Sequence, residues 1–345
     1  MTKPFVTLDD VATAAGLSRA QVSRALSGAP GVRVETRQQV AAMAAQLGYQ
    51  PNLAARSLAS ARSSIVGLVI GDLHNPFHIQ LAEAVDRELA AAGYDPVTSL
   101  RAAEAPGLIS ARLLRLRATG VVMIGTHHTP GVIADIAENI PCVYIGSKRI
   151  NHPRVTSIAV DDASGVRQAM EHLLALGHTH IVNLGGSSIE ASARERTKAY
   201  CALMTQAGLE PVSFPGLHDA ASGRRGVDLA FANNQRPTAI FASNDCIALG
   251  AIDRLKGMGL SVPEDVSVIG FDDIPDAKTE VFSLSTLRQD CAAQAKAAVS
   301  ALQSITNAGV RTCRARVMPV ELIIRRSTAA PNPKLALPAG PLADP

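Results

Sequence analysis

The N-terminal region carries apolar positions at the spacing of short amphipathic helices. Leu8, Val11 and Ala12 stand at positions i, i+3 and i+4, so they share one face of a helix. Thr7 precedes them, and Asp10 follows Thr7 by three residues, which is the pattern of a capping box. The sequence therefore predicts a first helix that opens at Thr7.

A second helix is predicted after a turn at Gly16, a residue that tolerates positive φ. Ser18 and Gln21 form another capping box, and Val22 and Leu26 lie on one face of the helix that follows. The opposite face carries short or basic side chains. These are Arg19, Ala20, Ser23 and Arg24.

A third helix is predicted from about Glu35 to Leu47, ended by Gly48. Two short helices joined by a glycine turn, with arginines near the start of the second, form the helix-turn-helix pattern. Arginine suits that place because it can donate two hydrogen bonds to a guanine. A generic three-helix bundle with solvated arginines would show the same spacing.

The segment at residues 51–63 is predicted to connect this head to the rest of the chain. Pro51 favours an extended entry, and Asn52 can cap a short helix over about residues 53–59. Such a helix is too short to be stable in isolation. The segment is therefore either a plain linker or a helix that orders only on DNA.

From Ser64 onward, short apolar runs alternate with amphipathic helical segments. The runs read as buried strands at 65–71, 121–124, 142–145, 156–160, 180–184, 239–242 and 266–270. The helical segments are 77–92, 163–176, 196–207 and 245–258. This alternation predicts an α/β core of two doubly wound parallel-sheet subdomains. Ligands of such folds bind at the carboxyl ends of the strands.

Charge is unevenly distributed along the chain. Residues 1–62 hold seven basic and three acidic side chains, a net charge of +4, although the whole chain carries only +3. A basic head on a nearly neutral body is typical of nucleic-acid binding. The sequence thus favours double-stranded DNA as a partner of the head.

Composition and motifs exclude several function classes. The five cysteines have no CxxC spacing, which argues against a disulfide framework or a zinc cluster. Neither a secretory signal nor a membrane-length apolar run is present. No HExxH, GxSxG or P-loop motif occurs. We expect a cytoplasmic protein, associated with the nucleoid, that is not an enzyme and needs no metal, cofactor or membrane.

Two segments, VTLDDVATAAGLSRAQVSRALSG and TRQQVAAMAAQLGYQPNLAARSLAS, closely resemble the head of the lactose-repressor (LacI/GalR) family of transcriptional regulators. The resemblance implies that the second helix reads the major groove and that residues 51–63 form a hinge helix in the minor groove. It implies that Leu58 pries apart a base step. The DNA-contacting positions implied are Thr7, Ser18, Arg19, Ala20, Gln21, Ser23, Arg24, Asn52, Ala55, Arg56 and Leu58. Arg33 departs from the family, which usually places a Ser or Thr cap before the third helix.

The core also resembles this family, through SIVGLVIGDLHNPF, HLLALGHTHIVNLGG, FASNDCIALGAIDRL and VPEDVSVIGFDD. The resemblance implies a periplasmic-binding-protein-like core. Its expected domains are a helix-turn-helix domain at 1–50, a hinge at 51–63, a core at 64–328 and a disordered, Pro/Ala-rich tail at 329–345. Within the core, the N-subdomain is expected at 64–160 and 291–320, and the C-subdomain at 161–290 and 321–328.

Polar residues at predicted strand ends are candidates for binding a small molecule. A carboxylate, an amide and a guanidinium that converge on a cleft would suit a sugar or polyol, although each alone could be a helix cap or a surface ion pair. The resemblance places the effector-binding positions at Asn75, Phe77, His78, Arg196, Asn244, Asp272 and Gln289.

Three positions depart from the family in this region. Ala220 stands where an aromatic ring often stacks on a sugar, Gly146-Ser147 stands where a charged residue is common, and Ala199 replaces a usual glycine. These departures argue against a standard pyranose and leave the effector unidentified.

Together these features predict a transcriptional repressor controlled by a small polar metabolite, such as a sugar derivative, bound between the two core subdomains. We expect a homodimer on a pseudo-palindromic operator, with effector and operator binding reciprocally linked. The alternatives are a solute-binding receptor of the periplasmic type, or an activator rather than a repressor.

Overall fold

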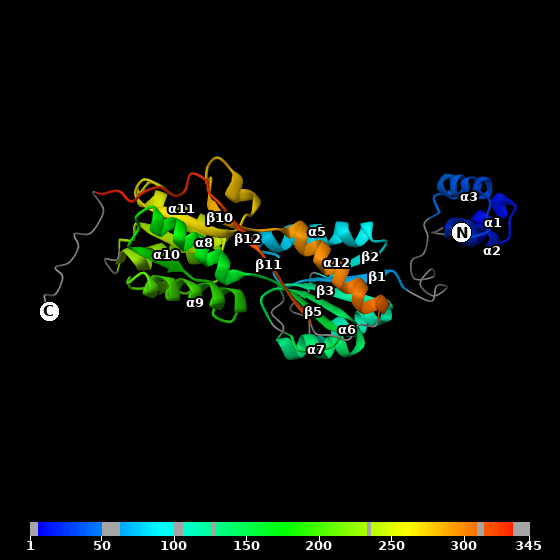
Figure 1. Cartoon of the computed structure of the whole chain (residues 1–345). Coiled ribbons are helices and arrows are strands. Elements are labelled where there is room, and N and C mark those ends of the chain that lie inside the picture. Colours follow the sequence, from blue (N-terminus) through cyan, green and yellow to red (C-terminus); the bar gives the residue numbers. More distant parts are fainter. Residues whose placement is uncertain are drawn as a thin grey trace. The chain divides into compact units, whose positions relative to one another are not determined.

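The computed structural model describes residues 6–49, 63–99, 106–125, 129–148, 150–232, 236–308 and 314–333. The chain divides into two units, residues 1–63 and 64–345, which are drawn in Figure 1. Each unit is described separately below.

The first unit contains three helices, α1 (Leu8–Ala15), α2 (Arg19–Leu26) and α3 (Val34–Leu47). Each helix contacts the other two, and fully buried Val11, Val22 and Val40 form the centre of their small core. This arrangement confirms the three-helix head.

Both predicted capping boxes are present in the head. The Thr7 amide donates to the Asp10 carboxylate at 2.8 Å, and the Ser18 amide donates to Gln21 Oε1 at 2.9 Å. Arg33 occupies the N-cap of α3 without a side-chain hydrogen bond to it, so the departure seen in the sequence leaves that helix without a side-chain cap.

The second unit contains two six-stranded sheets. The first has the order β11-β5-β4-β3-β1-β2, and all its strands are parallel. Its strands are β1 (Ile65–Ile70), β2 (Asp95–Ser99), β3 (Gly120–Ile124), β4 (Cys142–Ile145), β5 (Val155–Val160) and β11 (Arg314–Met318). Helices α5 (Pro76–Ala91) and α12 (Cys291–Ala308) cover one face, whereas α6 (Pro106–Arg115) and α7 (Pro130–Asn139) cover the other (Figure 1).

The second sheet has the order β12-β10-β9-β8-β6-β7. Its strands are β6 (Ile181–Leu184), β7 (Val212–Phe214), β8 (Ala239–Ala242), β9 (Ser267–Asp272), β10 (Ser285–Gln289) and β12 (Val320–Ile323), and β12 alone runs antiparallel to its neighbour. Helices α8 (Asp162–Ala175) and α9 (Ala191–Gln206) pack on one face. Helices α10 (Ala220–Ala232) and α11 (Asp245–Gly257) pack on the other, and a short 3₁₀ helix, η1 (Pro275–Lys278), follows β9.

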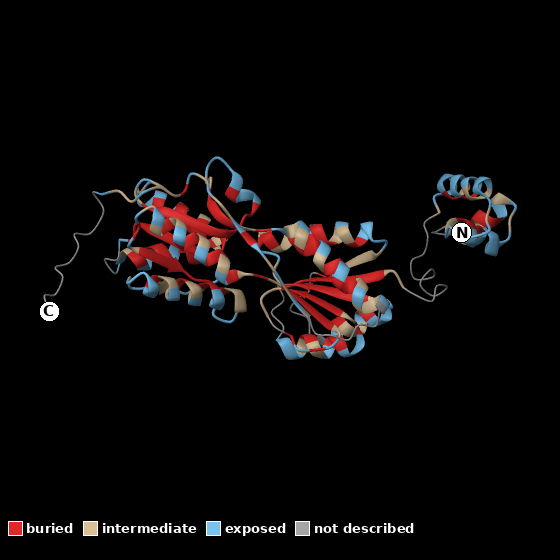
Figure 2. Ribbon diagram, in the orientation of Figure 1, coloured by how far each residue is buried: buried red, intermediate tan, exposed pale blue. Residues whose placement is uncertain are grey.

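Burial follows this layering. The strands of both sheets are largely buried, whereas the outer faces of the helices are exposed (Figure 2). Two helix-covered parallel sheets confirm the predicted α/β fold class. No helix within the described ranges is both long and apolar enough to cross a membrane.

The chain passes between the sheets after β5, after β10 and between β11 and β12. The boundary predicted at residue 320 differs from the structure, because Val320 already pairs with Gln289 in the second sheet. The third crossing is therefore at Pro319. Local sequence pattern does not distinguish two consecutive strands that belong to different sheets.

The predicted tail also begins too early. The Ala329 carbonyl accepts a hydrogen bond from Ser267 Oγ at 3.0 Å and lies 2.9 Å from His178 Nε2. Structure described in the core thus continues past Thr328, although proline and alanine dominate the composition there. Residues 334–345 lie outside the described part of the chain.

Candidate functional sites

A cavity lies where the carboxyl ends of strands from both sheets meet, and it measures about 750 Å³ including its open mouth. This volume lies within the range of small-molecule sites, roughly 300–1,000 Å³. Every effector position predicted from the sequence lies in its lining: Asn75, Phe77, His78, Arg196, Asn244, Asp272 and Gln289.

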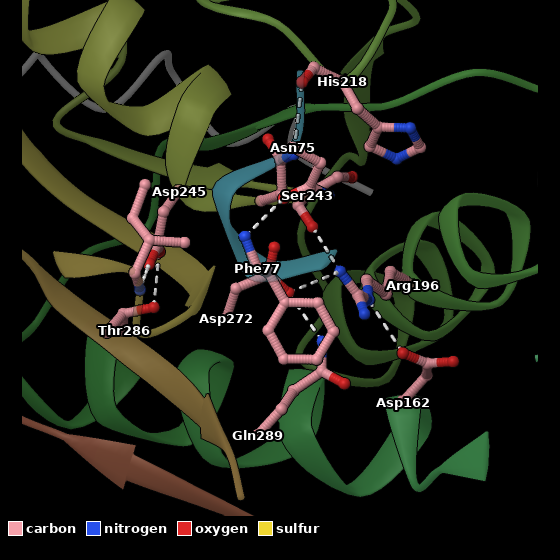
Figure 3. Close-up of polar contacts among 12 residues, drawn as sticks. Asn75, Phe77, Asp162, Arg196, His218, Ser243, Asp245, Asp272, Thr286 and Gln289 are labelled. Carbon is pink, nitrogen blue, oxygen red and sulfur yellow. Dashed lines mark hydrogen bonds and ion pairs between the residues drawn. The ribbon is translucent and has the colours of Figure 1, made fainter. Parts of the chain in front are cut away.

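Arg196 forms the centre of the cavity floor. Its Nε donates to Asp162 Oδ1 at 2.8 Å, and its Nη1 donates to the Ser243 carbonyl at 2.7 Å. The guanidinium carbon lies 3.5 Å from the centroid of the Phe271 ring, a cation–π arrangement. These contacts hold a buried cation in one orientation (Figure 3).

Asp272 lies beside this guanidinium, with Arg196 Nη1 3.8 Å from Asp272 Oδ1. Gln289 Nε2 donates to the same oxygen at 2.6 Å (Figure 3). Asp272 has a backbone φ of 128°, a strained value for a non-glycine residue. Burial raises the pKa of Asp272 to about 8, although Arg196 opposes that shift, and burial raises the pKa of Asp245 to about 6.

The two asparagines of the lining serve as helix caps. Asn244 Oδ1 accepts from the Ile247 amide at 2.9 Å, and Asn75 Oδ1 accepts from the Phe77 amide at 3.0 Å. The helix-cap explanation therefore holds for both oxygens. The Asn244 Nδ2 group donates to the His218 carbonyl at 3.4 Å, so both amides are oriented before any ligand binds.

His78 presents a neutral imidazole to the cavity. Its Nδ1 lies 3.3 Å from the Asp72 carbonyl, which can only accept, so Nδ1 carries the hydrogen. Burial lowers the pKa of His78. In this tautomer Nε2 is a hydrogen-bond acceptor.

Several lining residues were missed by the sequence analysis: Tyr144, Ser147, Lys148, Glu190, His218 and Gln294. His218 Nδ1 lies 3.2 Å from Glu190 Oε2, and it brings a ring into the cavity although Ala220 carries none. Ser147 Oγ donates to Asp162 Oδ2 at 2.8 Å, which assigns a contact to a position that seemed only to lack a charge.

Glycines near strand ends were the overlooked signal for these rings. A Cβ atom at Gly125, Gly146 or Gly186 would clash with the ring of His78, Tyr144 or His218 respectively. Each glycine follows a buried strand within two residues. A glycine at such a place predicts that a side chain of the site packs against its backbone. This set of three glycine–ring pairs is referred to below as the glycine cradles.

The predicted DNA-contacting positions fall into two groups in the head. Thr7, Ser18 and Gln21 use their side chains in capping boxes. Arg19 is exposed, 3.6 Å from Asp9, and the exposed Arg24 donates to the Pro30 carbonyl at 3.0 Å.

Two further positions, Ala20 and Ser23, are exposed on the same helix, α2. The remaining predicted DNA contacts lie outside the described residues. They are Asn52, Ala55, Arg56 and Leu58.

No cluster of three or more His, Cys, Asp or Glu side chains arranged to hold a metal ion occurs among the residues that the structure describes. The polar groups of the cavity are instead arranged in pairs around Arg196 and Asp272.

Two family models match the chain. Residues 7–52 match "Bacterial regulatory proteins, lacI family", and residues 170–328 match "Periplasmic binding protein-like domain". The lactose operon repressor of Escherichia coli (strain K12) is 31% identical over 339 residues, which cover 96% of this chain and 93% of the relative. The chain belongs to the LacI family.

Other members of the LacI family match over a similar extent. The regulator GalS of Salmonella typhimurium is 33% identical over 94% of this chain and 97% of its own length, and DegA of Bacillus subtilis is 30% identical over 94% and 99%. Among solved structures, the lac repressor dimer bound to operator and the anti-inducer ONPF matches with a TM-score of 0.81 and 28% identity, over 94% of this chain and all of that one.

Proposed function

We propose that this LacI-family protein is a sequence-specific transcriptional repressor whose DNA binding is controlled by a small polyhydroxylated metabolite held in the core cavity. The observation that carries the proposal is the convergence of seven predicted positions, from both sheets, on one cavity. A ligand that contacts both sheets would stabilise one angle between them. The solved lac repressor structures contain ONPF or ONPG, which supports a sugar or sugar derivative here.

In this proposal α2 enters the major groove and presents Arg19, Ala20 and Arg24 to base edges. Residues 51–63 pair with the same segment of a second copy, and Leu58 enters the minor groove. Two copies of the chain then bind a pseudo-palindromic operator. The lac repressor of the matching structure is likewise a dimer on its operator.

The same proposal makes the protein a cytoplasmic, non-enzymatic regulator without a cofactor. The relatives are regulators and repressors rather than enzymes. The buried ion pairs of the cavity bind and orient a ligand, and none is paired with a nucleophile in a catalytic arrangement. A helix-turn-helix head on the same chain favours a regulator over a solute-binding receptor.

The test begins with selection of bound sequences from a random duplex library by the full-length protein. We expect an inverted repeat to be enriched. A fixed panel of neutral aldoses, their methyl glycosides and aldonates is then added to the protein–operator complex in fluorescence anisotropy. At least one panel member should change operator affinity.

Arg24→Ala provides the residue-level control for DNA recognition. It should weaken binding to the selected operator by about 1–3 kcal/mol and relax the preference at one base pair. Enrichment of no inverted repeat, or an equal loss on random DNA with Arg24→Ala, would contradict the assignment of α2 to base reading.

A further inference from the structure

Gln294 has an unpaired polar group in the wall of the cavity. Its side chain is 2% exposed, and its Nε2 is buried without a hydrogen-bond partner. Buried amide groups in folded proteins are almost always paired, because an unpaired one has lost its water without replacement. Among the described residues with such an atom, Gln294 alone lines the cavity. A missing ligand atom explains this position better than a packing defect.

The position of Gln294 on the fold strengthens this interpretation. Gln289 ends β10 in the second sheet, and α12 begins two residues later and packs on the first sheet. Asp290 fixes this crossing, because its carboxylate accepts from the Ala293 amide at 2.9 Å. The two glutamines therefore enter one cavity from opposite subdomains, separated by a single rigid turn.

The surroundings of Gln294 define what it would bind. The first-sheet side of the lining is mostly apolar, with Leu81, Ile124, Ile145, Ile158 and Val160. The second-sheet side carries the charged network around Arg196 and Asp272. A ligand that fits both sides has a hydroxylated face toward Asp272 and an apolar face toward the first sheet. That apolar face must include one acceptor oxygen.

We propose that Gln294 is a specificity-determining residue of the cavity, whose Nε2 donates a hydrogen bond to an acceptor oxygen on the less polar face of a polyhydroxylated ligand. Sugars and their glycosides have this chemistry, with ring and glycosidic oxygens that accept but do not donate. The inference rests on the proposed function, since it assumes that the effector occupies this cavity. It adds that contact with α12 links ligand identity to the crossing between subdomains.

The experiment uses Gln294→Met, which keeps the side-chain length and removes the donor. Gln80→Met is the matched control: Gln80 also has a buried, unpaired Nε2 but lies outside the cavity lining, on α5, which packs against α12. Both variants are prepared as full-length protein. Their melting temperatures are measured without ligand and with each member of the panel of aldoses, methyl glycosides and aldonates.

Without ligand, both variants should melt at or above the wild-type temperature, because each removes an unpaired buried amide. With the panel member that most stabilises the wild type, Gln294→Met should lose at least tenfold in affinity by calorimetry. Gln80→Met should keep the wild-type affinity. Gln294→Glu, which turns the donor into an acceptor, should lose affinity for the same compound.

Two outcomes would overturn the inference. If Gln294→Met binds that compound as tightly as the wild type, Gln294 is not a ligand donor, although the proposed function stands. If Gln294→Met lowers the melting temperature without ligand while Gln80→Met does not, the amide has a structural partner instead. If no panel member binds the wild type while the inverted repeat is still enriched, the polyhydroxylated class is wrong and DNA reading is retained.

Discussion

The floor and the first-sheet wall of the cavity solve the problem of burial in opposite ways. On the floor, Arg196, Asp162, Asp272 and Gln289 satisfy one another before any ligand is bound. On the wall, apolar side chains surround the one amide, Gln294, whose nitrogen has no partner. The comparison teaches that a preorganised floor can orient a ligand at little further entropic cost, whereas the wall gains its missing contact only on binding.

The largest expected effect comes from breaking the floor. Arg196→Leu leaves two buried carboxylates without their cation, and removal of one partner from a buried pair typically costs about 3–5 kcal/mol. We expect a loss of that order in the free energy of unfolding by urea. Arg194→Leu, on the exposed side of the same helix, should change stability by less than about 0.5 kcal/mol. Similar effects of the two variants would mean that the floor is not a stabilising network.

The second effect is a pH dependence that belongs to the floor. Burial raises the pKa of Asp272 to about 8, so the folded protein binds a proton that the unfolded chain releases above about pH 4. This contribution is complete below the unfolded pKa and is lost as pH rises through the folded pKa. Stability should therefore fall between about pH 4 and pH 8.

Asp272→Asn should flatten that part of the profile, because the amide does not titrate. Thermal melts in buffers across this range measure it. Asp245 also has a pKa raised by burial, to about 6, so a residual slope at lower pH is expected in the variant. A variant profile as steep as the wild type would remove Asp272 as its source.

A third, smaller effect is expected where the two sides meet. Ser147 lies in the first-sheet subdomain and donates to Asp162 on the floor. Hydrogen bonds to charged groups contribute about 1.5–3 kcal/mol, and Asp162 keeps Arg196 as a partner, so Ser147→Ala should cost nearer the lower value. Ser147→Thr, which keeps the hydroxyl, should lose less in the same urea titration. Equal losses would point to packing rather than to the hydrogen bond.

The smallest effect should come from the wall. Ile158 is fully buried and lines the cavity, and removal of one methyl by Ile158→Val should cost about 0.5–1.5 kcal/mol. The pH profile of the variant should parallel the wild-type profile, since no floor group is changed. A changed pH profile would show that the wall and floor are electrostatically coupled, contrary to the comparison.

Local chemistry explains which features could be predicted from the sequence. The capping boxes at Thr7 and Ser18 form within three residues, so they do not depend on the rest of the fold. Asn244 and Asp272 could be predicted as neighbours because the carboxyl ends of parallel strands share one edge of a sheet. These regularities need no knowledge of packing.

Features that depend on distant partners could not be predicted. Helix α9 begins at Ala191, before the predicted start at Arg196, because the residues between them contain no glycine or proline to end a helix. The ring of His218 was missed because its place in the cavity depends on Gly186, which lies on another loop. Gln294 resembles any polar residue of an amphipathic helix until α12 is docked on the first sheet.

The glycine cradles restrict how the ligand preference of this protein can change over evolution. At Gly125, Gly146 and Gly186 any side chain would clash with a neighbouring ring, so mutations of the glycines are blocked while the rings remain. The rings themselves can be exchanged for smaller side chains without moving the backbone. The accessible first step toward a bulkier ligand is therefore loss of a ring at position 78, 144 or 218, and the small residue that made room for the ring then becomes part of the enlarged site.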